Sequence, residues 1–186
     1  MLENITVEDA VIRLSEADKG IHGLIIYPDL TTLREFYSCY TQIQLEEKNE
    51  MVLINPFYET TPSVRQILSQ CHKPIDLDKH ESEQTLLIND SLPEYFGIEA
   101  PMVSKDRLLH EVIKKGKNGL SVLADMGPFY YNKQYDKLVD YELSLPQHFD
   151  LNLKGICMYH QNDFGRLTEK QRQDLIEHHS MGYNIR

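Results

Sequence analysis

The stretch from Thr85 to Phe96, TLLINDSLPEYF, decides the fold of this chain. Its apolar first part, Thr85–Asn89, predicts a strand, and Asp90 and Ser91 follow directly where that strand ends. In an open α/β sheet, ligands bind beyond the carboxyl ends of the strands. The stretch therefore predicts a sheet whose strands carry polar side chains at one edge.

Outward from this stretch, short apolar runs alternate with longer amphipathic segments, a pattern typical of a parallel sheet covered by helices on both faces. The predicted strands are Ile21–Tyr27, Met51–Asn55, Thr85–Asn89, Leu120–Asp125 and Lys154–Tyr159, with a short sixth near Tyr183–Ile185. The predicted helices are Leu30–Leu45, Ser63–Gln70, Ser104–Lys115, Lys133–Leu143 and Thr168–His179, the last opened by a capping box of Thr168 and Gln171. The segment Gln70–Gln84 is expected to be a solvated loop. We expect a three-layer α/β fold with a mostly parallel sheet.

The length of 186 residues favours one domain over residues 1–186, with residues 1–19 as an N-terminal helical extension. The net charge of −10 and the lack of a Lys/Arg cluster argue against nucleic acid or an anionic membrane as a partner. No apolar run approaches the roughly 20 residues that cross a bilayer, and the N-terminus lacks the layout of a signal peptide. A cytoplasmic location is therefore expected.

The residues after the first predicted strand lack a phosphate-binding loop. The acid at the end of Thr85–Asn89 resembles the strand-end acid of RecA-type P-loop ATPases, in which a first strand leads into a Gly-rich turn that cradles phosphates. Here Ile21–Tyr27 runs into Pro28 and on to Arg34, PDLTTLR, with no glycine and no lysine. We expect a RecA-like scaffold without a P-loop that neither binds nor hydrolyses ATP.

Aromatic and polar residues at the ends of several strands suggest a pocket for a small molecule. Tyr27, Tyr58, Asp125, Phe129 and Tyr159 are expected to line it, and the tyrosines are expected to be partly exposed. The full set of candidate ligand-binding residues is His22, Tyr27, Tyr58, Asp90, Asp125, Phe129, Cys157, Tyr159 and Asp163. An alternative stays open, in which these loops are simply polar and the tyrosines fill the seams between helices and sheet.

His22 and Cys157 are unusual residue types inside strands, and each is either a ligand contact or a core residue. With parallel strands that are not staggered, His22 early in one strand and Cys157 late in another lie too far apart to share an ion. The three cysteines of the chain, Cys39, Cys71 and Cys157, are too scattered for a disulfide framework or a paired-cysteine zinc site. His178 and His179 are adjacent and are expected to cap the last helix. No metal and no cofactor are predicted.

The order of several short motifs resembles the MEDS domain, the sensory domain named from methanogens, methylotrophs and the dichloromethane-metabolism regulator. The motifs are HGLIIY at His22–Tyr27, MVLINPFY at Met51–Tyr58, LLINDSL at Leu86–Leu92 and GICMY at Gly155–Tyr159, followed by Asp163-Phe164 and His178-His179. The resemblance spans nearly the whole chain, from Gly20 to Ile185. It implies a RecA-like relative of the circadian-clock ATPase without an intact nucleotide site, in which His22, Tyr27, Cys157 and Tyr159 match family motifs.

These observations predict a non-catalytic sensory, ligand-binding domain of prokaryotic signal transduction that senses a small organic molecule. Because no kinase or DNA-binding module follows the motifs, the signal is expected to pass to a separate partner, such as a kinase or transcription regulator, or through a homodimer. Two alternatives remain. One is an enzyme that uses Asp125, Asp90 or Cys157 on a small substrate, and the other is a protein-interaction module built on a degenerate ATPase scaffold.

Overall fold

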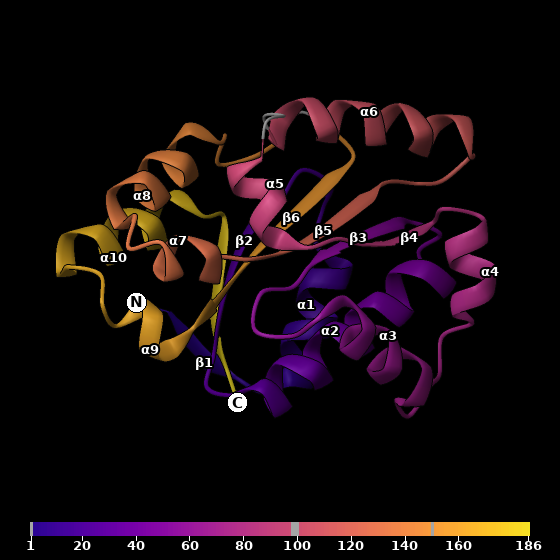
Figure 1. Ribbon diagram of the computed structural model, residues 1–186, viewed down its shortest axis with the longest axis horizontal. Coiled ribbons are helices and arrows are strands. Elements are labelled where there is room, and N and C mark those ends of the chain that lie inside the picture. Colours follow the sequence, from indigo (N-terminus) through magenta and orange to yellow (C-terminus); the bar gives the residue numbers. More distant parts are fainter. Residues whose placement is uncertain (1, 98–100, 150) are drawn as a thin grey trace.

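A parallel sheet forms the centre of the protein (Figure 1). The computed structural model describes residues 2–97, 101–149 and 151–186, and in these residues seven strands pair in the order β1-β7-β2-β6-β5-β3-β4. All neighbouring strands run parallel. The strands are β1 (Glu3–Ile5), β2 (His22–Tyr27), β3 (Met51–Asn55), β4 (Leu86–Ile88), β5 (Leu120–Asp125), β6 (Leu153–His160) and β7 (Met181–Ile185).

Helices cover both faces of this sheet, so the three-layer α/β architecture is confirmed. On one face lie α1 (Val7–Glu16), α2 (Leu30–Glu46), α3 (Thr61–Gln70) and α4 (Leu77–Ser82). On the other lie α5 (Ser91–Phe96), α6 (Pro101–Lys114), α7 (Gly127–Tyr131), α8 (Tyr135–Ser144), α9 (Gln161–Phe164) and α10 (Glu169–His178). We call these the α1–α4 face and the α5–α10 face.

Strand β2 shows how the two cores are separated. All six of its residues are buried, as expected for a strand covered on both faces. Leu24 and Ile26 belong to the core under the α5–α10 face, whereas Ile25 and Tyr27 belong to the core under the α1–α4 face. This alternation follows from the two-residue period of a strand.

The structure differs from the sequence prediction at several short elements, which include the unpredicted helices α5 and α9. Residues Glu3–Ile5 form β1, which pairs with β7, although Glu3 and Asn4 are exposed and the segment carries no strand pattern. The expected loop Gln70–Gln84 contains the short helix α4, whose first turn is capped by Asp76. Helix α7 follows β5 directly, where no helix was predicted. Each element is short, so its sequence holds too little periodicity to identify it.

The turn after β2 is closed by a carboxylate. Asp29 is the N-cap of α2, and its Oδ1 accepts a hydrogen bond of 2.9 Å from the Thr32 N–H. A phosphate would need the N–H groups and the positive end of the helix dipole at this position. The negative charge of Asp29 occupies them, which supports the expectation that the chain does not bind ATP.

The last helix begins as predicted. The Thr168 side chain accepts from the Gln171 N–H and the Gln171 side chain accepts from the Thr168 N–H, so the capping box is confirmed. Across the described residues, no helix combines the length and apolar character needed to span a bilayer.

Candidate functional site

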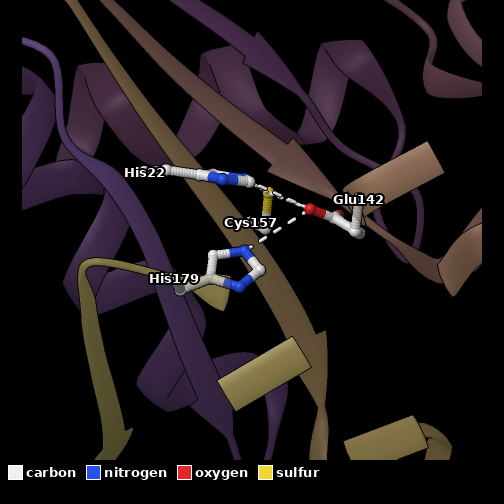
Figure 2. A group of neighbouring side chains, drawn as sticks. All are labelled: His22, Glu142, Cys157 and His179. Atoms are coloured by element: carbon white, nitrogen blue, oxygen red, sulfur yellow. Dashed lines mark hydrogen bonds and ion pairs between the residues drawn. The ribbon is translucent and has the colours of Figure 1, made fainter. Parts of the chain in front are cut away.

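Four side chains from distant parts of the chain converge between the sheet and helices α8 and α10 (Figure 2). They are His22 at the start of β2, Glu142 in α8, Cys157 in β6 and His179 just after α10. All four are buried, and one nitrogen, oxygen or sulfur atom from each lies within 4.8 Å of the others. We call this cluster the Glu142 centre.

The register of β2 and β6 brings His22 to Cys157. His22 pairs with Gly155, and Cys157 stands two residues further along β6 on the same side of the sheet. The His22 Nε2 and Cys157 Sγ atoms are 3.5 Å apart. The expectation that these side chains lie too far apart is therefore wrong, because β6 begins before β2 and the strands are staggered.

Glu142 is the residue that the sequence analysis missed. It lies on the buried stripe of α8 with Leu138 and Val139, and its exposed fraction is 0%. Helical periodicity does predict that Glu142 is buried, because a position four residues after Leu138 and three after Val139 falls on the apolar face of a helix. An acid at such a position has to find polar partners, because burying an unpaired carboxylate is costly.

The partners of Glu142 fix its charge. Its Oε1 accepts a hydrogen bond of 3.1 Å from the Tyr159 hydroxyl, and its Oε2 accepts one of 3.4 Å from the Cys157 thiol. Nε2 of His22 is 3.2 Å and Nε2 of His179 is 3.4 Å from the same Oε2. Burial alone raises the pKa of Glu142, but the two imidazoles outweigh it and hold that pKa well below its usual range. Glu142 is therefore a carboxylate, and burial lowers the pKa of His22.

His179 is fixed by a bond from its other ring nitrogen. Nδ1 lies 2.7 Å from the Leu175 carbonyl oxygen, which can only accept, so Nδ1 carries a proton. The bond satisfies a carbonyl in the last turn of α10, which is the capping role predicted for this residue. His178 instead has its Nε2 2.7 Å from the Leu145 carbonyl oxygen at the end of α8. Nε2 of His179 has no hydrogen-bond partner.

A small cavity adjoins the centre. Its volume is about 20 Å³, which is enough for one water molecule. His22 and Cys157 supply polar atoms to its wall, and most of the other lining is apolar, including Tyr141 and Phe149. Any ligand that fits this space without rearrangement is very small.

A second polar group lies at the carboxyl ends of the strands, where the sequence placed the site. The Tyr27 hydroxyl donates a hydrogen bond of 3.1 Å to Asp125 Oδ2, and the Gly127 N–H donates one of 2.8 Å to Oδ1. Asp125 is 1% exposed. Burial raises its pKa to about 7, although the bonds from Gly127 and Tyr27 act in the opposite direction.

Two more of the predicted site residues, Tyr58 and Asp163, contact each other at the same edge of the sheet. The Tyr58 hydroxyl donates to Asp163, which is also paired with Arg166. The ring of His160 contacts the ring of Tyr27 edge-on and the tilted ring of Tyr58, with centroids 5.4 and 5.7 Å away. The structure thus brings Tyr27, Tyr58, Asp125 and Asp163 together.

The other candidate residues lie elsewhere. Tyr159 belongs to the Glu142 centre with His22 and Cys157, and Phe129 packs against the rings of Tyr95, Phe96 and Tyr141. Asp90 is exposed and caps α5 through a 3.0 Å bond from the Leu92 N–H. The expectation of partly exposed tyrosines is wrong for Tyr27 and Tyr159, which, like Phe129, are at most 2% exposed. Tyr58, at 40%, is the candidate tyrosine that reaches solvent.

Comparison with known proteins adds no identification. No family model matches the chain, and no curated protein is significantly similar to it in sequence. The resemblance to the MEDS domain therefore stays a prediction that depends on the order of short motifs.

The three cysteines should differ in their rates of alkylation in the native protein. Cys39 is exposed, Cys71 is half-buried with its thiol directed at the Leu68 and Lys73 carbonyls, and Cys157 is buried. We expect Cys39 to react first and Cys157 last, because a buried thiol that donates to a carboxylate is a poor nucleophile. Timed alkylation with peptide mapping measures the order. Labelling of Cys157 as fast as Cys39 would show that the Glu142 centre is open to solvent.

Proposed function

We propose that this chain is a non-catalytic sensory domain of prokaryotic signal transduction, located in the cytoplasm, that binds a small organic molecule at the Glu142 centre. One observation carries the proposal: His22, Glu142, Cys157 and His179 converge beside a cavity of about 20 Å³ inside the sheet scaffold. Buried polar clusters are costly unless every group has a partner. A centre with an unpartnered imidazole nitrogen is suited to receiving a ligand, and binding of an organic molecule larger than water requires the adjoining cavity to widen.

The arrangement of the acids and the thiol favours binding over catalysis. The enzyme alternative uses Asp125, Asp90 or Cys157, and the structure places these three residues apart from one another. Cys157 belongs to the core of the α5–α10 face, whereas Asp125 bonds to Tyr27 in the core of the α1–α4 face. Asp90 stands apart at the start of α5.

Helix α8 links ligand binding to the protein surface. It contributes Glu142 to the centre and Tyr141 to the cavity wall, and it packs against α10, after which His179 follows. A ligand that changes the spacing at the centre therefore moves α8 relative to α10. In this proposal the outer surface of these helices passes the signal to a separate partner, a kinase or transcription regulator, or to a second copy of the chain.

The test is to identify what the purified protein retains. Native mass spectrometry of the freshly purified chain, followed by denaturation and chromatography with mass detection, should show one small organic molecule per chain. Ala124 lines the cavity, so Ala124→Val should abolish retention by filling the space. Ala10→Val adds the same two methyl groups under the α1–α4 face and should leave retention unchanged.

Two results contradict the proposal. One is a native mass equal to that of the polypeptide with nothing organic released. The other is equal retention in the wild type and in Ala124→Val, which would place the ligand away from the Glu142 centre.

A further inference from the structure

Four separations between side-chain atoms of the Glu142 centre match those of a tetrahedral metal site. Oε2 of Glu142 is 3.2 Å from His22 Nε2, 3.4 Å from His179 Nε2 and 3.4 Å from Cys157 Sγ. Sγ of Cys157 is 3.5 Å from His22 Nε2. A tetrahedron with metal–ligand bonds of about 2.0–2.3 Å has ligand atoms roughly 3.3–3.8 Å apart. Four of the six separations are thus close to those that one central ion requires, and all four atoms lie within 4.8 Å of one another.

The orientation of His179 leaves one of its ring nitrogens for a ligand at this place. Because Nδ1 donates to the Leu175 carbonyl, Nε2 is the ring nitrogen that faces the centre. That nitrogen has no hydrogen-bond partner and lies 3.4 Å from Oε2 of Glu142. One ion between these two atoms would also be within reach of His22 and Cys157.

We infer that the Glu142 centre binds one zinc-class divalent ion, with His22 Nε2, Glu142 Oε2, Cys157 Sγ and His179 Nε2 as its ligands. Two imidazoles, a thiolate and a carboxylate form a mixed set that suits Zn²⁺, whereas Mg²⁺ and Ca²⁺ prefer oxygen ligands throughout. The Cys157 thiol loses its proton to the buffer when the sulfur–metal bond forms.

Outer contacts hold two of the ligands in position. The Tyr159 hydroxyl binds Oε1 of Glu142, which leaves Oε2 directed at the centre. The Leu175 carbonyl fixes the tautomer of His179 that presents Nε2. Such outer partners are typical of protein metal sites. His178, next along the chain, is directed at the Leu145 carbonyl instead and supplies a matched control.

The inference adds an ion to the Glu142 centre but does not rest on the sensory proposal. A chain that binds zinc and retains no organic molecule would keep the metal site and overturn the sensor. A chain that retains an organic molecule and binds no zinc would keep the sensory proposal and overturn the metal site.

The first experiment titrates the full chain, freed of metal by a chelator, with Zn²⁺ alone. Calorimetry and elemental analysis should both give one ion per chain. Cys157→Ser and His179→Gln should each weaken binding by more than the roughly 10- to 100-fold that an outer contact is worth, and Tyr159→Phe should fall within that range. His178→Gln should bind as the wild type does. Stoichiometric binding that survives in both Cys157→Ser and His179→Gln would overturn the inference, as would the absence of binding in the wild type.

A second measurement decides the matter if the ligand variants do not fold. Co²⁺ added to the metal-free wild type should give the intense d–d absorption of a tetrahedral ion and a thiolate-to-metal charge-transfer band, and one equivalent of Zn²⁺ should remove both. A cobalt spectrum without the thiolate band would exclude Cys157 as a ligand and overturn the site as assigned.

Discussion

Replacing Glu142 by alanine should lower the free energy of unfolding of the metal-free protein by about 3–5 kcal/mol. The carboxylate is fully buried and accepts hydrogen bonds from Tyr159 and Cys157. Its Oε2 also lies beside the Nε2 atoms of His22 and His179. Truncation leaves these groups without a partner in an apolar surrounding, and each unsatisfied polar group costs about 1–3 kcal/mol. Chemical unfolding in the presence of a chelator measures the loss.

Two control variants separate the role of the carboxylate from that of helix α8. Glu142→Gln keeps the volume and an acceptor for Tyr159, so its cost should be clearly smaller than that of alanine. Asp140→Ala changes an exposed acid in the same helix and should stay within about 0.5 kcal/mol of the wild type. A loss below about 1 kcal/mol for Glu142→Ala would show that the carboxylate does not organise the centre.

The titration of Asp125 should remove part of the stability of the protein as the pH rises. Its pKa is raised by burial from 3.8 to about 7, so the native state holds a proton there that the unfolded state releases. The stability that this group contributes is fully present below pH 3.8 and is lost as the pH rises through 7. A difference of about 3 pKa units at 1.36 kcal/mol each gives a total of about 4 kcal/mol.

Asp125→Asn isolates this contribution. The amide oxygen still accepts from the Gly127 N–H and the amide nitrogen can donate to the Tyr27 hydroxyl, while no proton is exchanged. The variant should therefore gain stability relative to the wild type by about 4 kcal/mol between acidic and mildly alkaline pH. Unfolding curves recorded across this range give the difference directly.

Tyr27→Phe gives a second test of whether Asp125 causes this pH dependence. The Tyr27 hydrogen bond lowers the pKa of Asp125, so its removal should raise that pKa and move the loss of stability to higher pH. If stability depended on pH in the same way in the wild type and in Asp125→Asn, the claim that the native protein holds a proton on Asp125 would be wrong.

The sequence by itself determined the layers of the fold and several elements in detail. Met51–Asn55 and Leu120–Asp125 are strands with the predicted bounds, and the capping box at Thr168 opens the last helix. These features depend on residues within one turn or one strand, so local periodicity and capping chemistry are enough to find them. The lack of a Gly-rich turn after β2 can likewise be read directly from the residues that follow the strand.

Only the tertiary structure decided which of the candidate residues meet. The pairing of His22 with Gly155 joins segments more than a hundred residues apart, and that register places Cys157 beside the imidazole. Burial of Glu142 in the same place depends on how α8 packs on the sheet. A strand pattern states which side chains share a face, but the stagger between strands is set by long-range pairing and by the packing of both cores. The Glu142 centre could therefore not be found from local sequence, although His22, Cys157 and His179 had each been considered.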